Sequence, residues 1–135
     1  MRLDLYQEET ERIATQQDAV LNEARAILDA GRPLSALENN GLLHALQVLI
    51  ENAIGKAKQW LKSKGLVVPI SAYDTFAALA AAEMIHDADL KTWNALVGIR
   101  NRIVHDYMNI EMPRIYGLVQ RGDYQFVVDF LMKRP

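Results

Sequence analysis

The 135-residue sequence contains no cysteine, and only seven glycines and four prolines interrupt it. Without cysteine, disulfide bonds and thiolate metal ligands are excluded. No apolar run approaches the roughly 18 residues that a membrane-spanning helix needs. The first nine residues turn acidic and polar where a signal peptide requires an apolar stretch. We therefore expect a cytoplasmic protein that does not enter a membrane.

An excess of positive charge is also missing, since the net charge is −2 and the isoelectric point is near 5.9. Nucleic-acid binding is largely electrostatic, so these values do not by themselves indicate a nucleic-acid-binding protein. The basic residues are unevenly placed, however. We interpret the lysines as solvent-facing positions on a helix, and a local basic groove on an acidic body stays open as the alternative. The two basic stretches are Lys56, Lys58, Lys62 and Lys64, and Arg100, Arg102, Arg114 and Arg121.

The sparse glycines and prolines fall where helices are expected to end. Apolar residues at seven-residue spacing predict one long amphipathic helix over residues 3–30, which Gly31 and the following proline stop. Ser35 and Glu38 have the spacing of a capping box and predict the start of a second helix. Its apolar positions continue at spacings of three and four to about Lys64.

The second half of the chain predicts further helices with short connections. The apolar link 66–70 has no strand to pair with, so we expect it to be extended and packed on the helices. Helices are expected at 71–86, 90–107 and 113–132, the last interrupted at Gly122. One domain over residues 1–135 is predicted, an all-α antiparallel bundle of four to five helices.

The end of the helix expected at 90–107 concentrates polar residues of several kinds: Arg100, Asn101, Arg102, His105 and Tyr107. At about 100° per residue, Arg100 and His105 differ by roughly 140° and flank a groove, with Asn101 on the arc between them. Continued helix would return Tyr107 to nearly the azimuth of Arg100. The segment predicts a site on one face of a helix end.

These residue types suit RNA cleavage without a metal ion. Histidine can move protons to and from the reacting oxygens, and arginine can stabilise the phosphorane. Asparagine could orient the imidazole or the phosphate. One histidine cannot serve separately as acid and base, which favours a dimer. A lone arginine or histidine at a helix end commonly has a structural role, so the residue types alone leave a catalytic and a structural interpretation open. We interpret His44 and His86 as hydrogen-bonded or surface residues without a catalytic role.

The sequence Arg100-Asn101-Arg102-Ile103-Val104-His105 resembles the Arg-X4-His motif of the HEPN-domain ribonucleases. Its continuation to Asp106-Tyr107 resembles the longer motif of the HepT-like toxins, and the segments Glu51-Asn52-Ala53-Ile54 and Tyr73-Asp74-Thr75-Phe76 are similar to that family's second and third helices. The resemblance covers essentially the whole chain.

The resemblance implies a HEPN-like bundle that dimerises, with two motifs facing one RNA cleft, and that acts as the toxin of a HEPN/MNT toxin–antitoxin module. It implies catalytic roles for Arg100 and His105, a supporting role for Asn101 and RNA contact by Arg102. The implied partner is an MNT-type nucleotidyltransferase antitoxin that transfers AMP to Tyr107. The expected assembly is a homodimer, with a larger hetero-oligomer with the antitoxin left open. Neither a metal ion nor a cofactor is implied.

Two other interpretations remain open at this stage. The bundle could be a non-catalytic subunit that presents substrates or nucleotides to a nucleotidyltransferase, or a purely structural bundle whose polar segment only ends a helix. The sequence has no dense cluster of carboxylates with ligand spacing, no phosphate-binding glycine-rich loop and no serine nucleophile signature.

Overall fold

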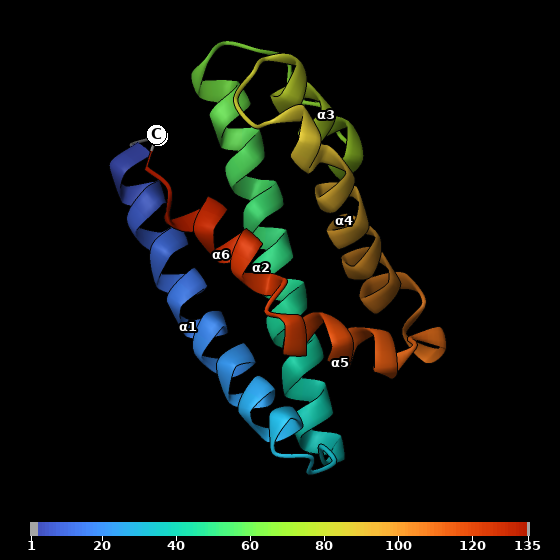
Figure 1. Ribbon diagram of the computed structural model, residues 1–135. Helices are drawn as coiled ribbons and strands as arrows, with labels where there is room; N and C mark the ends of the chain where they lie inside the picture. The colour runs from blue at the N-terminus through green and yellow to red at the C-terminus, as the bar shows by residue number, and fades with distance from the viewer. Residues whose placement is uncertain (1–2, 135) are drawn as a thin grey trace.

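The computed structural model describes residues 3–134, in which all regular secondary structure is helical, as predicted (Figure 1). None of the helices in this range has the length and apolarity that crossing a bilayer requires. The helices are α1 (Leu3–Asp29), α2 (Ala36–Ser63), α3 (Ala72–Ala81), α4 (Leu90–His105), α5 (Met112–Arg121) and α6 (Tyr124–Met132), with short 3-10 turns η1 (Asp87–Asp89) and η2 (Tyr107–Asn109).

The hairpin of α1 and α2 forms as the glycine and capping patterns predict. Gly31 has a φ of +79°, a left-handed conformation that glycine adopts without steric cost. The Ser35 hydroxyl accepts a hydrogen bond from the Glu38 backbone N–H, and the Glu38 carboxylate accepts one from the Ser35 N–H. Arg32 donates two further hydrogen bonds to Glu38, at 2.9 and 2.7 Å. The reciprocal bonds fix the first turn of α2.

Helix α2 lies at the centre of the bundle and packs against α1, α3, α4 and α6 (Figure 1). An aromatic cluster joins four of these helices. Trp93 of α4 stacks on Phe76 of α3 with ring centroids 4.3 Å apart, and Phe130 of α6 lies 4.8 Å from Trp93 and 5.2 Å from Trp60 of α2. Such ring pairs contribute about 0.5–1.5 kcal/mol each beyond their buried area. The cluster holds α4 against the core.

The third helix ends at Ala81, five residues earlier than predicted. Glu83 adopts a φ of +60°, and the Met84 N–H donates to the Leu79 carbonyl at 2.9 Å. This is the arrangement that ordinarily ends a helix at glycine. Because glutamate stands where glycine is usual, the sequence contains no visible signal for this end.

The link between α2 and α3 is extended, without a strand, as predicted, but it does not pack on the helices. Val67 is 87% exposed and Ile70 is 97% exposed. The link arches at the end of the bundle where α2 ends (Figure 1). Lys58 donates to the Ile70 carbonyl at 3.0 Å and ties the end of the link to α2.

The interpretation of the lysines as solvent-facing is wrong for Lys56, which is 1% exposed. Its ammonium lies against the rings of Trp60 and Phe130, at 5.0 and 5.2 Å from their centroids. It donates to the carbonyls of Phe130 at 2.7 Å and Leu131 at 3.0 Å, and to that of Lys133. These carbonyls lie at the C-terminal end of α6, so Lys56 caps that helix from across the core.

Candidate active site

The polar segment lies at the C-terminal end of α4, which is fixed to the core by Trp93, Val97 and Ile103. The helix ends at His105, because Asp106 has a φ of −143° and a ψ of 43°. The Asp106 backbone carbonyl and carboxylate both accept hydrogen bonds from Asn109, at 3.0 and 2.6 Å. The predicted continuation of the helix to Tyr107 is therefore wrong, and Tyr107 does not share the azimuth of Arg100.

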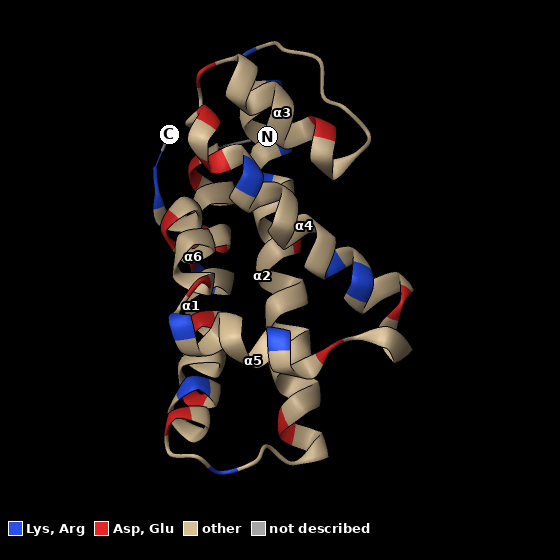
Figure 2. Cartoon of the chain, turned by 45° about the vertical axis from the view of Figure 1, so that its right-hand side comes forward, with Lys and Arg blue, Asp and Glu red and all other residues tan. Residues whose placement is uncertain are grey.

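Arg100 is held by Glu51 of α2. Its Nε and Nη2 both donate to Glu51 Oε2, at 3.0 and 2.8 Å. The two side chains are partly buried, with 27% of Arg100 and 36% of Glu51 exposed. Figure 2 shows basic positions at this end of α4, the end that carries Arg100 and Arg102. The pair fixes the guanidinium between α4 and α2.

Asn101 makes a further hydrogen bond with Arg100. Its Oδ1 accepts a hydrogen bond from Arg100 Nη1 at 3.1 Å. A guanidinium has five N–H groups, and Glu51 and Asn101 together use three of them. The other two N–H groups of Arg100 have no hydrogen-bond partner among residues 3–134. We expected Asn101 to orient the imidazole or the phosphate, and its side-chain oxygen instead bonds to Arg100.

His105 is exposed, and none of the hydrogen bonds found within residues 3–134 involves its imidazole. Along the helix it lies about 7.5 Å from Arg100 and about 140° around the axis. Arg100 is turned toward α2, since it bonds to Glu51. One chain therefore joins Arg100, Asn101 and Glu51 by hydrogen bonds, and none of the hydrogen bonds found within residues 3–134 links the His105 side chain to them.

Tyr107 reaches back to the first turns of α2. Its hydroxyl donates to Asn40 Oδ1 at 2.9 Å, and 48% of the residue is exposed. The neighbouring Asn39 accepts a matching hydrogen bond from the hydroxyl of Tyr116 in α5. Two adjacent asparagines thus anchor two tyrosines, of which Tyr107 is the more exposed. The Tyr107 hydroxyl lies at the surface near the motif and remains within reach of a second molecule.

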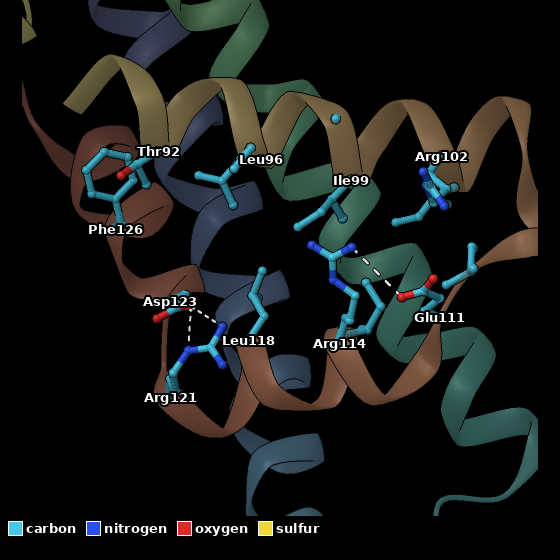
Figure 3. A pocket seen from close by; sticks show the side chains of 15 residues that line it. Thr92, Leu96, Ile99, Arg102, Glu111, Arg114, Leu118, Arg121, Asp123 and Phe126 are labelled. Carbon is cyan, nitrogen blue, oxygen red and sulfur yellow. Dashed lines mark hydrogen bonds and ion pairs between the residues drawn. The ribbon is translucent and has the colours of Figure 1, made fainter. Parts of the chain in front are cut away.

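Arg102 points away from Glu51 into a separate groove of about 690 Å³ between α4 and α5 (Figure 3). Leu96, Ile99 and Ile103 of α4 form one wall, and Arg114 of α5 stands on the other. The guanidinium of Arg102 makes no hydrogen bond or ion pair with any other residue in the described range 3–134. The motif therefore has two polar sides, one at Glu51 and one on this groove.

Glu51 is the functional candidate that the sequence did not identify. The segment beginning at Glu51 was noticed only as resembling a helix of a known family, with no role for the carboxylate. Nothing in the sequence connects it to Arg100, since the two are 49 residues apart. Within residues 3–134 no group of three or more His, Asp and Glu side chains is arranged to hold a metal ion.

An all-α bundle with an Arg-X4-His motif at a helix end defines a protein of the HEPN class. A scan against protein-family profiles matches residues 33–133 to the family described as ribonuclease HepT-like. The chain belongs to this family. A search of curated protein sequences finds no match.

Several solved structures share the fold. One, described as a toxin–antitoxin with AMP-PNP, aligns with a TM-score of 0.78 at 18% identity and covers 93% of this chain and 97% of its own. A tri-AMPylated HEPN toxin of Shewanella oneidensis in complex with MNT antitoxin aligns with a TM-score of 0.67 at 22% identity, covering 88% and 96%. A mutant of the toxin–antitoxin MntA–HpeT gives 0.75 at 19% identity, covering 93% and 96%. At these identities the likeness shows the HEPN fold.

Proposed function

We propose that the protein is a metal-independent endoribonuclease and the toxin of a HEPN/MNT toxin–antitoxin pair. The observation that carries the proposal is the set of hydrogen bonds that Arg100 makes. Glu51 and Asn101 fix its guanidinium and leave two N–H groups unused, on the same helix end as the exposed imidazole of His105. Membership of the ribonuclease HepT-like family supports this assignment. The function places the protein in the cytoplasm, where its RNA substrate is found.

In the proposed reaction, the 2′-hydroxyl of a ribonucleotide attacks the adjacent phosphorus. The bond between O2′ and phosphorus forms, and the bond between phosphorus and O5′ breaks. A histidine takes the proton from O2′, and a proton is delivered to O5′ as it leaves. The products are a 2′,3′-cyclic phosphate and a 5′-hydroxyl. Arg100 binds the non-bridging phosphate oxygens, on which negative charge develops in the phosphorane.

The placement of His105 argues for a site shared between two protomers. Within one chain, His105 and Arg100 lie about 140° apart around α4, and Arg100 is turned toward Glu51 of α2. In a homodimer, the second chain supplies another histidine and allows separate acid and base. Cleavage activity per protein molecule should then fall when the protein is diluted below its dimer dissociation constant, as measured in parallel with analytical ultracentrifugation.

We further propose that an MNT-type nucleotidyltransferase neutralises the toxin by modifying Tyr107. The Tyr107 Oη attacks the α-phosphorus of ATP, the phenolic proton is lost, and pyrophosphate leaves. The exposed position of Tyr107, two residues after His105, supports this role. So does the AMPylated state of the Shewanella oneidensis toxin of the same fold. The added phosphate is negatively charged and would repel the RNA backbone from the neighbouring motif.

The experiment that tests the nuclease is RNA cleavage by purified protein in EDTA. Wild type should cleave and leave cyclic phosphate ends, and His105→Ala should lose about 10²- to 10⁴-fold in rate. His86→Ala is the matched control, because His86 is also exposed and lies at the other end of α4. Its rate should equal that of wild type.

Three outcomes would contradict the proposal. Equal cleavage by wild type and His105→Ala would indicate a contaminant or another site. Strict dependence on Mg²⁺ would refute the metal-independent mechanism. No cleavage by protein whose Tyr107 is shown to be unmodified by mass spectrometry would favour a non-catalytic binding subunit of a nucleotidyltransferase.

A further inference from the structure

The groove between α4 and α5 contains features that the proposed cleavage chemistry does not use. It runs from Arg102 and Glu111 at one end to Phe126 and Asp123 at the other, with α4 along one side and α5 along the other (Figure 3). Between Thr92 and Arg102, α4 extends for about 15 Å. The groove is therefore long enough for a short stretch of an extended polymer.

The charge along the groove is uneven. At the far end Arg121 is neutralised by Asp123, with contacts at 3.0 and 2.9 Å. At the end near the motif, Arg114 has only a loose contact of 3.8 Å with Glu111, and 80% of its side chain is exposed. Arg102 has no ion-pair partner within the described residues. Uncompensated positive charge thus lies next to the Arg-X4-His motif.

Between the charged ends the groove is apolar. Leu96 and Ile99 come from α4, and Leu118 comes from α5. Phe126 closes the apolar part, with its ring 4.9 Å from that of Trp93. Aromatic and apolar surfaces bind the faces of unpaired bases, and arginines bind the phosphates between them. A base-paired duplex hides its base faces and could use only the arginines.

We infer that this groove binds the single-stranded RNA that flanks the scissile phosphate, with phosphates on Arg102 and Arg114 and bases on the apolar wall toward Phe126. The inference rests on the proposed ribonuclease function and adds the strand and the path of the substrate. RNA fits the groove better than a second protein copy, because an apolar protein surface would leave Arg102 without an anionic partner.

The groove is tested by RNA binding in the His105→Ala background, where cleavage does not interfere. The probe is a fluorescein-labelled oligouridylate, and its dissociation constant is measured by anisotropy at several salt concentrations. Arg114→Glu should weaken binding about tenfold and reduce the salt slope by about one, since one phosphate contact is lost. Arg12→Glu makes the same charge change on α1, which lies on the opposite side of α2 from α4, and should bind like the parent (Figure 1).

A second pair of variants leaves the arginines unchanged and tests whether RNA needs the open space of the groove. Ala95 lines the groove and Asn94 does not, although both are exposed positions of α4. Ala95→Glu should weaken oligouridylate binding at least about fivefold by blocking the path with an anionic side chain, and Asn94→Glu should not. Both replacements are at exposed sites, and thermal unfolding checks that each variant folds.

Several results would overturn the inference. One is equal binding by the groove variants and their controls. Another is equal affinity for oligouridylate and for a duplex of the same length. A third is a change in sedimenting mass of Arg114→Glu without loss of RNA affinity, which would assign the groove to a protein contact. These results are independent of the proposed nuclease, because a groove that binds RNA in a protein without cleavage activity would refute only the latter.

Discussion

The Glu51 carboxylate on α2 holds the Arg100 guanidinium on α4 through two hydrogen bonds to a single oxygen, at 3.0 and 2.8 Å. The contact fixes the orientation of the arginine and leaves two of its N–H groups unused beside Asn101. Glu51 itself does not need to touch RNA. We therefore regard it as a positioning residue for the proposed site.

Replacing Glu51 distinguishes a role in orienting Arg100 from a role in binding RNA. In Glu51→Gln the loss of one negative charge should leave the KM for RNA unchanged or lower, since RNA is an anion. The kcat should fall about tenfold, because the guanidinium is no longer held in one orientation. Steady-state cleavage assays measure both values. Glu51→Asp, which keeps the charge and shortens the side chain, should recover part of the kcat.

The same variant should remain folded, since a partly exposed ion pair contributes only about 0–1 kcal/mol to stability. Glu8→Gln, an exposed position on α1, is the charge-matched control and should leave both kinetic constants unchanged. An unchanged kcat in Glu51→Gln would show that the contact is structural only.

The sequence could predict how the residues of the site on α4 lie relative to one another, but not which residue of another helix they contact. Arg100, Asn101 and Arg102 lie on one helix whose apolar spacing is visible, so their relative placement follows from helix geometry. The partner Glu51 is distant in sequence, and its contact depends on how α4 packs on α2. The end of α4 at Asp106 depends on a local turn formed with Asn109, which displaced Tyr107 from its predicted position.

The hydrogen bonds to Glu38 in the capping box of α2 predict how the free energy of unfolding depends on pH. The hydrogen bond from Arg32, followed by that from the Ser35 backbone N–H, lowers the pKa of Glu38 from 4.5 to about 2. A carboxyl whose pKa is lower in the folded state stabilises the fold above its unfolded pKa, and this contribution is lost as pH falls. The loss should occur between about pH 4.5 and pH 2.

Chemical denaturation at a series of pH values measures this contribution. In Glu38→Gln the free energy of unfolding should depend less on pH across the window from 4.5 to 2 than in wild type. Glu23→Gln, an exposed residue of α1, should keep the wild-type dependence. An identical acid profile for Glu38→Gln and wild type would refute the role assigned to the capping box.

Lys56 gives the strongest prediction for stability. Its ammonium donates to three carbonyls at the end of α6, and Lys56→Met keeps an unbranched side chain one atom shorter while removing every donor. Burial lowers the pKa of Lys56 to about 8, so the ammonium remains mostly charged at neutral pH. We expect Lys56→Met to lower the free energy of unfolding by about 3 kcal/mol, because the orphaned carbonyls outweigh the relief of burying a charge.

Lys58→Met is the matched control, two residues along the same helix. Lys58 makes one exposed hydrogen bond to Ile70, and its loss should cost no more than about 0.5 kcal/mol. Urea denaturation compares the two variants. If Lys56→Met is as stable as wild type, burial of the charge costs as much as the three hydrogen bonds contribute. The sequence could not reveal this residue, because it belongs to a run of lysines that otherwise face solvent.

A comparison of Tyr107 with Tyr116 distinguishes loss of the proposed modification site from loss of a structural hydrogen bond. Tyr107 and Tyr116 both donate to asparagines at the start of α2, so replacing either by phenylalanine removes one comparable hydrogen bond. After incubation with an MNT-type nucleotidyltransferase and ATP, the intact mass of Tyr116→Phe should rise by one or more AMP groups, as in wild type. Tyr107→Phe should show no increase, because it lacks the nucleophilic oxygen.

Cleavage provides the second readout of the same pair. Unmodified Tyr107→Phe should cleave RNA like wild type, since the proposed chemistry depends on Arg100 and His105, and the transferase should no longer inhibit it through AMP transfer. Persistent inhibition without added mass would mean that the partner blocks the toxin by binding. Added AMP on Tyr107→Phe would place the acceptor elsewhere. Exposure favours Tyr107 in this comparison, because 48% of Tyr107 is exposed whereas Tyr116 is partly buried.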